Sequence, residues 1–215
     1  KLTCHDKKIS KGFLSTYLNE GVQHVFINRG GLITAQGSHH FVFPSGKHCD
    51  RFLRTGNILL VSSEIYFIAF SLLKHFDETK HNQIYCDTSS INSVAFALTE
   101  LKFRFLPLEK RKQIPIESFS SYDGLYKKEF TYGRDAFLLI SASTSSNIIL
   151  YILNNHKIIS RENIVIMYYL GEEKNYANIK DQVLCNLTKS KQNPTGVEFY
   201  RTYKEDDCQH CKSGS

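Results

Sequence analysis

A run of small hydroxyl side chains is the part of the sequence best suited to hold a phosphate. It follows an apolar segment at residues 136–140 and comprises Ser141, Ser143, Thr144, Ser145, Ser146 and Asn147. Small residues let the backbone approach an anion, and hydroxyl and backbone N–H groups donate hydrogen bonds to it. The same residues could instead serve only to cap the helix expected after them.

A second polar loop follows the segment at residues 83–86 and comprises Asp87, Thr88, Ser89 and Ser90. In open parallel sheets, ligands lie at the carboxyl ends of the strands, where loops lead into helix N-termini. Both loops are expected at such positions. We therefore expect them to contact a phosphorylated sugar, a nucleotide or a nucleic-acid end.

A third candidate group lies near the N-terminus and contains a Ser-Gly pair followed by three cations. It comprises Ser45, Gly46, Lys47, Arg51 and Arg54. Beside a cleft, three cations could bind a phosphate or carboxylate, and the alternative is a solvated basic face. His39, His40 and His48 surround this group, and histidines in hairpins are more often surface residues than metal ligands.

The C-terminal Cys208-Gln209-His210-Cys211 motif supplies two sulfurs three positions apart. A structural zinc ion normally has four ligands, so a further Cys or His must complete the set, and Cys185 is the expected third sulfur. The alternative is that these cysteines are reduced surface thiols. Without a secretory signal, a disulfide framework is not expected among the six cysteines.

Several common catalytic motifs are missing from the sequence. It contains no Gly-x-Ser-x-Gly, no Walker loop and no Gly-x-Gly-x-x-Gly. Hydrolase and kinase functions therefore have no motif to support them.

Apolar periodicity predicts the elements that position these residues. Helices are expected at residues 10–20, 63–76, 92–103 and 146–154, and strands at 22–28, 31–35, 40–43, 83–86, 114–117, 136–140, 163–169, from 183, and 197–203. Alternating strands and helices predict an α/β fold with a Rossmann-like, mostly parallel sheet and helices on both faces. One domain is expected over residues 1–215: an N-terminal helix and antiparallel hood (10–60), an α/β core (61–170), and C-terminal strands with the Cys-x-x-Cys tail (171–215).

Composition sets broad limits on function. The formal net charge is +6 and the pI is about 8.9, but the cations are scattered among 21 acids. Nucleic-acid binding is therefore a secondary expectation. No apolar run reaches the roughly 18–20 residues of a membrane span, and the N-terminus lacks a signal-peptide core, so a cytoplasmic protein is expected. A homodimer or larger complex is compatible with the sequence.

Together these features resemble the type I phosphoribosyltransferases, and among them the orotate phosphoribosyltransferases. The segment at residues 41–52, FVFPSGKHCDRF, is similar to that family's F-x-L-x-S-G-x-K-S-x-x-Y stretch. The long helix, the loop after residue 86, and the strand, loop and helix at residues 136–153 follow in the family's order. The resemblance covers residues 10–170 and implies a phosphoribosyl pyrophosphate site.

The sequence departs from the family where the chemistry is carried out. Ser141 and Ala142 occupy the positions of two adjacent acids, and Asn147 occupies that of a glycine. The loop at residues 87–91 lacks the expected glycine and lysine, and Pro44 stands where lysine is frequent. The family's mobile catalytic loop maps to residues 118–128, where only Gly124, Lys127 and Lys128 match its composition.

The resemblance and its departures lead to three hypotheses. The favoured one is a catalytically degenerate domain that binds a phosphorylated ligand without transferring it. The second is an active, divergent transferase that uses Mg²⁺ with Asp87 and Asp50. The third is a non-catalytic interaction subunit of a bacterial conflict or mobile-element system. Zn²⁺ at the cysteines is compatible with all three.

Overall fold

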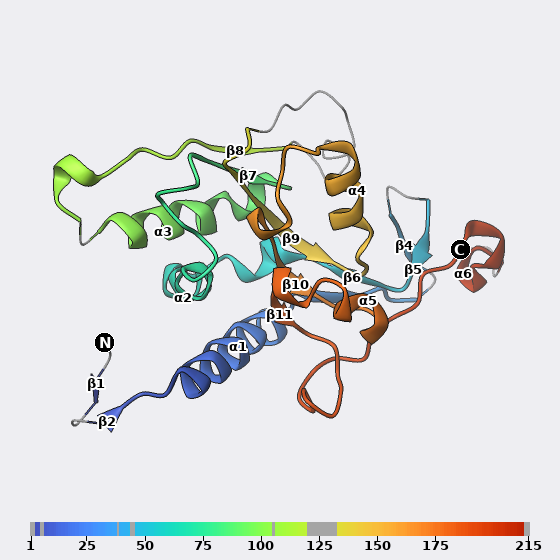
Figure 1. Cartoon of the computed structure of the whole chain (residues 1–215). Coiled ribbons are helices and arrows are strands. Elements are labelled where there is room, and N and C mark those ends of the chain that lie inside the picture. The colour runs from blue at the N-terminus through green and yellow to red at the C-terminus, as the bar shows by residue number, and fades with distance from the viewer. Residues whose placement is uncertain are drawn as a thin grey trace.

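The computed structural model describes residues 3–4, 7–37, 39–43, 46–104, 106–119 and 133–212. Within them, five parallel strands form the central sheet, in the order β11, β10, β9, β7, β8 (Figure 1). Their bounds are β7 Gln83–Cys86, β8 Ile116–Ser118, β9 Ala136–Ser143, β10 Ile164–Tyr169 and β11 Val183–Asn186. This topology confirms the predicted Rossmann-like, mostly parallel α/β class.

Helices cover both faces of the sheet. Strand β9 shows the division, because Phe137 and Leu139 belong to one buried cluster and Leu138 and Ile140 to another. The first cluster contains side chains of α1 (Lys11–Asn28), α2 (Ser62–Leu72) and α3 (Asn92–Phe103). The second contains side chains of α4 (Asn147–Asn155), with Tyr176 of the short α5 (Glu173–Ala177) packed against it. Strands buried on both faces are continuous apolar runs, as in β10.

The hood consists of two antiparallel strand pairs. Strand β3 (Leu32–Thr34) pairs with β6 (Arg51–Leu53), and β4 (Phe41–Val42) pairs with β5 (His48–Cys49). Gly37 and Gly46 have φ values of +64° and +72° in the hood loops, a conformation that favours glycine. The antiparallel character of the hood is therefore confirmed for the strands predicted at residues 31–35 and 40–43, but not for the strand predicted at residues 22–28.

Short elements complete the chain. A separate pair joins β1 (Thr3–Cys4) to β2 (Lys7–Lys8), and helix α6 (Gln209–Lys212) lies in the tail. Single 3-10 turns occupy Thr55–Ile58, Ser89–Ile91, Leu108–Lys110, Arg161–Asn163, Lys180–Gln182 and Glu205–Asp207.

Helix α1 corrects two predictions. It begins after Ser10, whose hydroxyl accepts a hydrogen bond from Phe13 N, but it continues through Gly21 to Asn28. The strand predicted at residues 22–28 is therefore wrong. Val22, Val25 and Phe26 are buried at helical spacing, which short β-prone runs imitate. Gly21 lies inside the helix, where a Cβ would lie 2.5 Å from the Phe67 ring of α2, so glycine here allows α1 and α2 to pack closely.

Other boundaries differ by a few residues. Strand β8 begins two residues later than predicted, and α2 ends at Leu72 rather than residue 76. Strand β9 extends to Ser143, because Ala142 and Ser143 pair with Tyr168 and Tyr169 of β10. No strand forms at residues 197–203, where only isolated bridges join Val197 to Thr188 and Tyr203 to His48.

Among the helices of the described ranges, none is long and apolar enough to cross a membrane.

Candidate functional site

The two predicted loops leave neighbouring strands of the sheet. Strands β7 and β9 are paired in parallel, with Cys86 opposite Leu139. Their carboxyl ends therefore reach the same edge. The first loop passes through the Ser89–Ile91 turn into α3, and the second leads from Ser143 into α4. Strand pairing thus brings both groups of hydroxyl residues to one edge.

Asp87 joins the two strands at this edge. Its Oδ1 accepts a hydrogen bond from Ser141 N at 2.9 Å, and its Oδ2 accepts one from Ser141 Oγ at 2.6 Å. The Asp87 residue is 0% exposed. Burial raises the pKa of Asp87 to about 7, although the hydrogen bonds from Ser141 lower it. Asp87 is therefore a structural group that holds β9 to the loop after β7.

The loop between β9 and α4 is organised by its own serines. Ser143 Oγ donates to Ser145 O at 2.8 Å, and Asn147 N donates to Ser145 Oγ at 3.3 Å. The N-cap residue of α4 is Ser146, whose side chain makes no capping hydrogen bond, so the simpler hypothesis is met only by Ser145, which accepts from the first helical amide. Ser146 is buried, and Thr144 is partly exposed. The amides of the first turn have no acceptor inside the helix, so they can donate to an anion.

The first loop presents exposed hydroxyls. Ser89 and Ser90 are exposed, and the Oγ of Ser90 lies 2.6 Å from Oγ1 of Thr88. Asn92, which starts α3, was not predicted. Its Nδ2 donates to Ser118 Oγ at 3.3 Å, while its buried Oδ1 has no hydrogen-bond partner within the described ranges. The edge therefore offers exposed hydroxyls and helix amides, whereas the Asn92 oxygen is enclosed.

The predicted cations of the hood are dispersed. Lys47 and Arg54 are exposed, and Gly46 shapes the turn before β5. Pro44 and Ser45 lie outside the described residues, as do Gly124, Lys127 and Lys128 of the predicted catalytic loop. Of the predicted cations, Arg51 lines a pocket.

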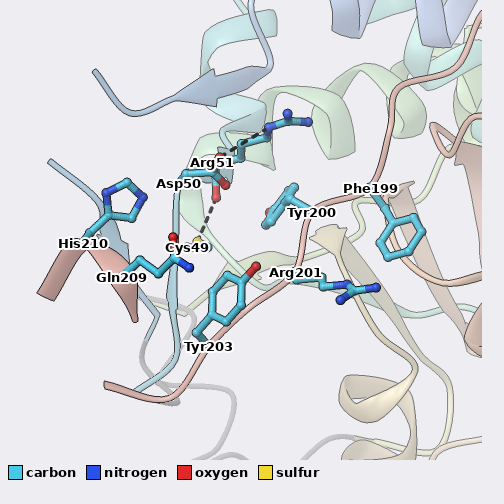
Figure 2. Close-up of a pocket in the computed structure, with 9 residues that line it drawn as sticks. All are labelled: Cys49, Asp50, Arg51, Phe199, Tyr200, Arg201, Tyr203, Gln209 and His210. Carbon is cyan, nitrogen blue, oxygen red and sulfur yellow. Dashed lines mark hydrogen bonds and ion pairs between the residues drawn. The ribbon is translucent and has the colours of Figure 1, made fainter. Parts of the chain in front are cut away.

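That pocket lies between the hood and the C-terminal tail and has a volume of about 290 Å³. Figure 2 shows its lining residues, which are Cys49, Asp50, Arg51, Phe199, Tyr200, Arg201, Tyr203, Gln209 and His210.

Two buried polar atoms in this pocket lack a hydrogen-bond partner among the described residues, Arg51 Nε and Tyr200 Oη. Arg51 Nε lies 3.9 Å from Asp50 Oδ2, an ion-pair distance. Burial raises the pKa of Tyr200 above its ordinary value, so Tyr200 remains a neutral donor. The pocket thus combines unsatisfied donors with the exposed cation Arg201.

A compact set of metal-binding side chains lies beside the pocket. One ligand atom from each of His40, His48, Cys208 and Cys211 lies within 4.8 Å of the other three. Cys208 and His48 are buried, and the other two residues are partly exposed. This is a Cys2His2 donor set, the kind that holds Zn²⁺ in structural sites.

Cys185 is not part of this set. It lies in β11, is completely buried in the main core, and its thiol is directed at Asn19 O of α1 at 3.9 Å. The expectation of a third sulfur is replaced by two histidines. Their presence around the hood was a usable signal in the sequence. What the sequence did not reveal is the pairing of Tyr203 with His48, which brings the tail to the hood.

Comparisons with known proteins give a remote likeness. No protein-family model and no curated protein matches the sequence. The chain is similar to an orotate phosphoribosyltransferase from Aeropyrum pernix, with 12% identity, 77% of this chain and 94% of that chain covered, and a TM-score of 0.46. It is also similar to the UMP synthase of Leishmania donovani, with 10% identity, 77% and 36% coverage, and a TM-score of 0.46.

A third similar structure is an orotate phosphoribosyltransferase from Mycobacterium tuberculosis H37Rv. The identity is 12%, the coverage is 80% of this chain and 95% of that chain, and the TM-score is 0.39. At these values the likeness concerns the course of the chain and assigns neither a ligand nor a reaction.

Proposed function

We propose that the protein is an α/β domain that binds a phosphorylated sugar or nucleotide at the carboxyl edge of its sheet and does not transfer it. The observation that carries this proposal is the state of Asp87. Its carboxylate is enclosed and bonded twice to Ser141, so it is withdrawn from any ligand. What remains at the edge are hydroxyls and helix amides, which suit an anion.

Transfer chemistry would need more negative charge than this edge provides. Release of pyrophosphate requires a bound metal and carboxylates that stabilise positive charge developing on the ribose. Asp50, the other acid of the transferase hypothesis, faces Arg51 in the hood pocket. An acid at position 141 would meet Asp87 in a buried position, which like charges oppose. Ser141 thus fits the binding role.

A second anion site is favoured by the unsatisfied donors of the hood pocket. Arg51 Nε and Tyr200 Oη are buried without hydrogen-bond partners among the described residues, although Arg51 Nε lies 3.9 Å from Asp50 Oδ2, and Arg201 adds an exposed positive charge. A carboxylate or phosphate placed there would pair with Arg201, and a shift of the lining side chains would be needed for it to reach the two buried donors. In this alternative the ligand is recognised by charge, and the sheet edge is only scaffold.

Calorimetric titration with a nucleoside monophosphate, in buffer containing EDTA, tests the proposal. We expect binding without magnesium. The Ser145→Ala/Ser146→Ala double variant should weaken the affinity at least tenfold, because each charge-assisted hydrogen bond contributes about 1.5–3 kcal/mol. Ser160→Ala is the matched control, since this exposed serine lies outside both loops and should leave the affinity unchanged.

Two results would count against the sheet edge. Absence of binding at millimolar ligand would contradict the proposal and leave an interaction module as the better description. Unchanged binding by the double alanine variant, together with loss in Arg201→Ala, would move the ligand to the hood pocket. Thermal unfolding of each variant separates lost contacts from lost folding.

A further inference from the structure

We propose that His40, His48, Cys208 and Cys211 bind one Zn²⁺ ion in tetrahedral coordination, and that this ion fastens the C-terminal tail to the hood. The site is independent of the proposed function at the sheet edge. It joins residues of the first quarter of the chain to the last described helix.

The spacing of the donor atoms fits a tetrahedral ion. Cys211 Sγ lies 3.5 Å from His40 Nε2 and 3.2 Å from His48 Nδ1, and the two nitrogens are 2.9 Å apart. With zinc bonds of about 2.0–2.3 Å, the edges of a coordination tetrahedron measure roughly 3.3–3.8 Å. Small outward shifts of these side chains would therefore accommodate an ion at their centre.

Backbone contacts position three of the four residues, His48 from the hood and Cys208 and Cys211 from the tail. His48 lies in β5, opposite Val42 of β4, and exchanges two backbone hydrogen bonds with Tyr203 of the tail, at 2.8 and 2.9 Å. The Glu205–Asp207 turn then positions Cys208, whose N–H donates to Glu205 O at 3.1 Å. Cys211 follows in α6. These contacts explain why ligands so distant in sequence converge.

The chemistry of the donors selects the metal. Two thiolates balance the charge of a divalent ion, and two neutral imidazoles complete four ligands without adding charge. Sulfur and nitrogen donors favour Zn²⁺ over Mg²⁺ or Ca²⁺, which bind oxygen. Four protein ligands fill a tetrahedral site and leave no position for water, so the ion is structural.

Two arrangements without metal compete with this proposal. Cys208 and Cys211 could form a disulfide, or the four side chains could form only the short hydrogen bonds seen between them. Neither arrangement binds a metal ion. Metal stoichiometry therefore separates them from the proposal.

The test begins with the full chain purified in reducing buffer without chelators or an affinity tag that binds metal. Native mass spectrometry should show one zinc ion per chain. After exchange, Co²⁺ should give the absorption bands of a tetrahedral cobalt site with thiolate ligands. Removing zinc should lower the thermal midpoint by about 10 °C, as expected for an ion present at a thousand times its dissociation constant.

Variants assign the ligands. Cys211→Ser and His40→Asn should each lose the ion. Three matched controls should keep one equivalent: Cys49→Ser, Cys185→Ser and His210→Asn. Cys49 is a buried hood cysteine whose thiol bonds Arg51 O at 2.9 Å, and the His210 ring stacks on His40 at 5.7 Å. Cys49 and His210 thus lie beside the site, whereas Cys185 lies in the main core, and none of the three is a proposed ligand.

The proposal fails if reduced wild-type protein binds no zinc in the presence of excess metal. It also fails if the cobalt spectrum lacks thiolate-to-metal absorption, or if any of the three control variants loses the ion while Cys211→Ser retains it. The cobalt spectrum of the wild-type protein tests the proposal even if a variant does not fold.

Discussion

Replacing Asp87 with alanine is expected to lower the free energy of unfolding by about 3 kcal/mol at pH 6. The Asp87 side chain accepts hydrogen bonds from both Ser141 N and Ser141 Oγ in a buried position. Its removal leaves both donors without their acceptor and opens a gap between β7 and β9, and each unsatisfied buried group costs about 1–3 kcal/mol. Urea unfolding measures the loss.

Asp87→Asn is the matched variant, and it should change the pH dependence of stability rather than the packing. The asparagine Oδ1 can accept from Ser141 N, and its Nδ2 can donate to Ser141 Oγ. The folded pKa of Asp87, about 7, lies above that of an unfolded aspartate, about 3.9. Its contribution to stability is therefore complete below pH 4 and is lost as the pH rises through 7.

We therefore expect wild type and Asp87→Asn to be equally stable near pH 4. Above pH 7, Asp87→Asn should be the more stable, by up to about 1.4 kcal/mol for each unit of the pKa difference. Urea unfolding of both proteins between pH 4 and pH 8 measures this difference. Equal slopes over that range, or a stable Asp87→Ala protein, would contradict the role given to this carboxyl group.

Gly171→Ala should also destabilise the protein, by about 3 kcal/mol. Gly171 is buried two residues after the end of β10; its N–H donates to Thr188 Oγ1, and its carbonyl accepts from the same hydroxyl. A Cβ at this position would collide with Thr144 O and lie 2.6 Å from Tyr169 Oη. Overpacking of this kind typically costs about 1–3 kcal/mol, and here one colliding atom is backbone.

The same substitution should also disturb the proposed ligand site, because Thr144 belongs to the loop between β9 and α4. Gly171→Ala is expected to weaken nucleotide binding as well as stability. Gly12→Ala is the control: nothing lies within 4 Å of its added Cβ, and alanine favours the helix. Equal thermal midpoints for the two variants would show that the packing around Gly171 tolerates a methyl group.

The parallel core could be predicted from the sequence because long apolar runs coincide with its elements. Helix α3 matches its predicted bounds, and β7 does as well. The N-terminal region was harder, since the short run Val22–Phe26 contains β-branched and aromatic residues that helices and strands share. Burial against α2 decided in favour of the helix, and burial is a tertiary effect that no local pattern reports.

In the candidate sites, too, local features could be predicted from the sequence and tertiary contacts could not. The hydroxyl loops were found because their position after a strand is a local property. The partnership of Asp87 with Ser141 was missed, because it depends on which strands pair. The cysteine pair was recognised as a half-site, but its histidine partners come from a hairpin 160 residues or more away. The bridge between His48 and Tyr203 brings the two segments together, and it depends on the tertiary fold.

The central claim is binding without transfer, and phosphorus NMR of phosphoribosyl pyrophosphate with the protein tests it most directly. The sample contains Mg²⁺ and a mixture of nucleobases that includes orotate. We predict that the phosphate resonances broaden or shift as protein is added, and that no free pyrophosphate accumulates. Pyrophosphate that forms in proportion to protein concentration, or resonances unperturbed at millimolar ligand, would contradict the claim.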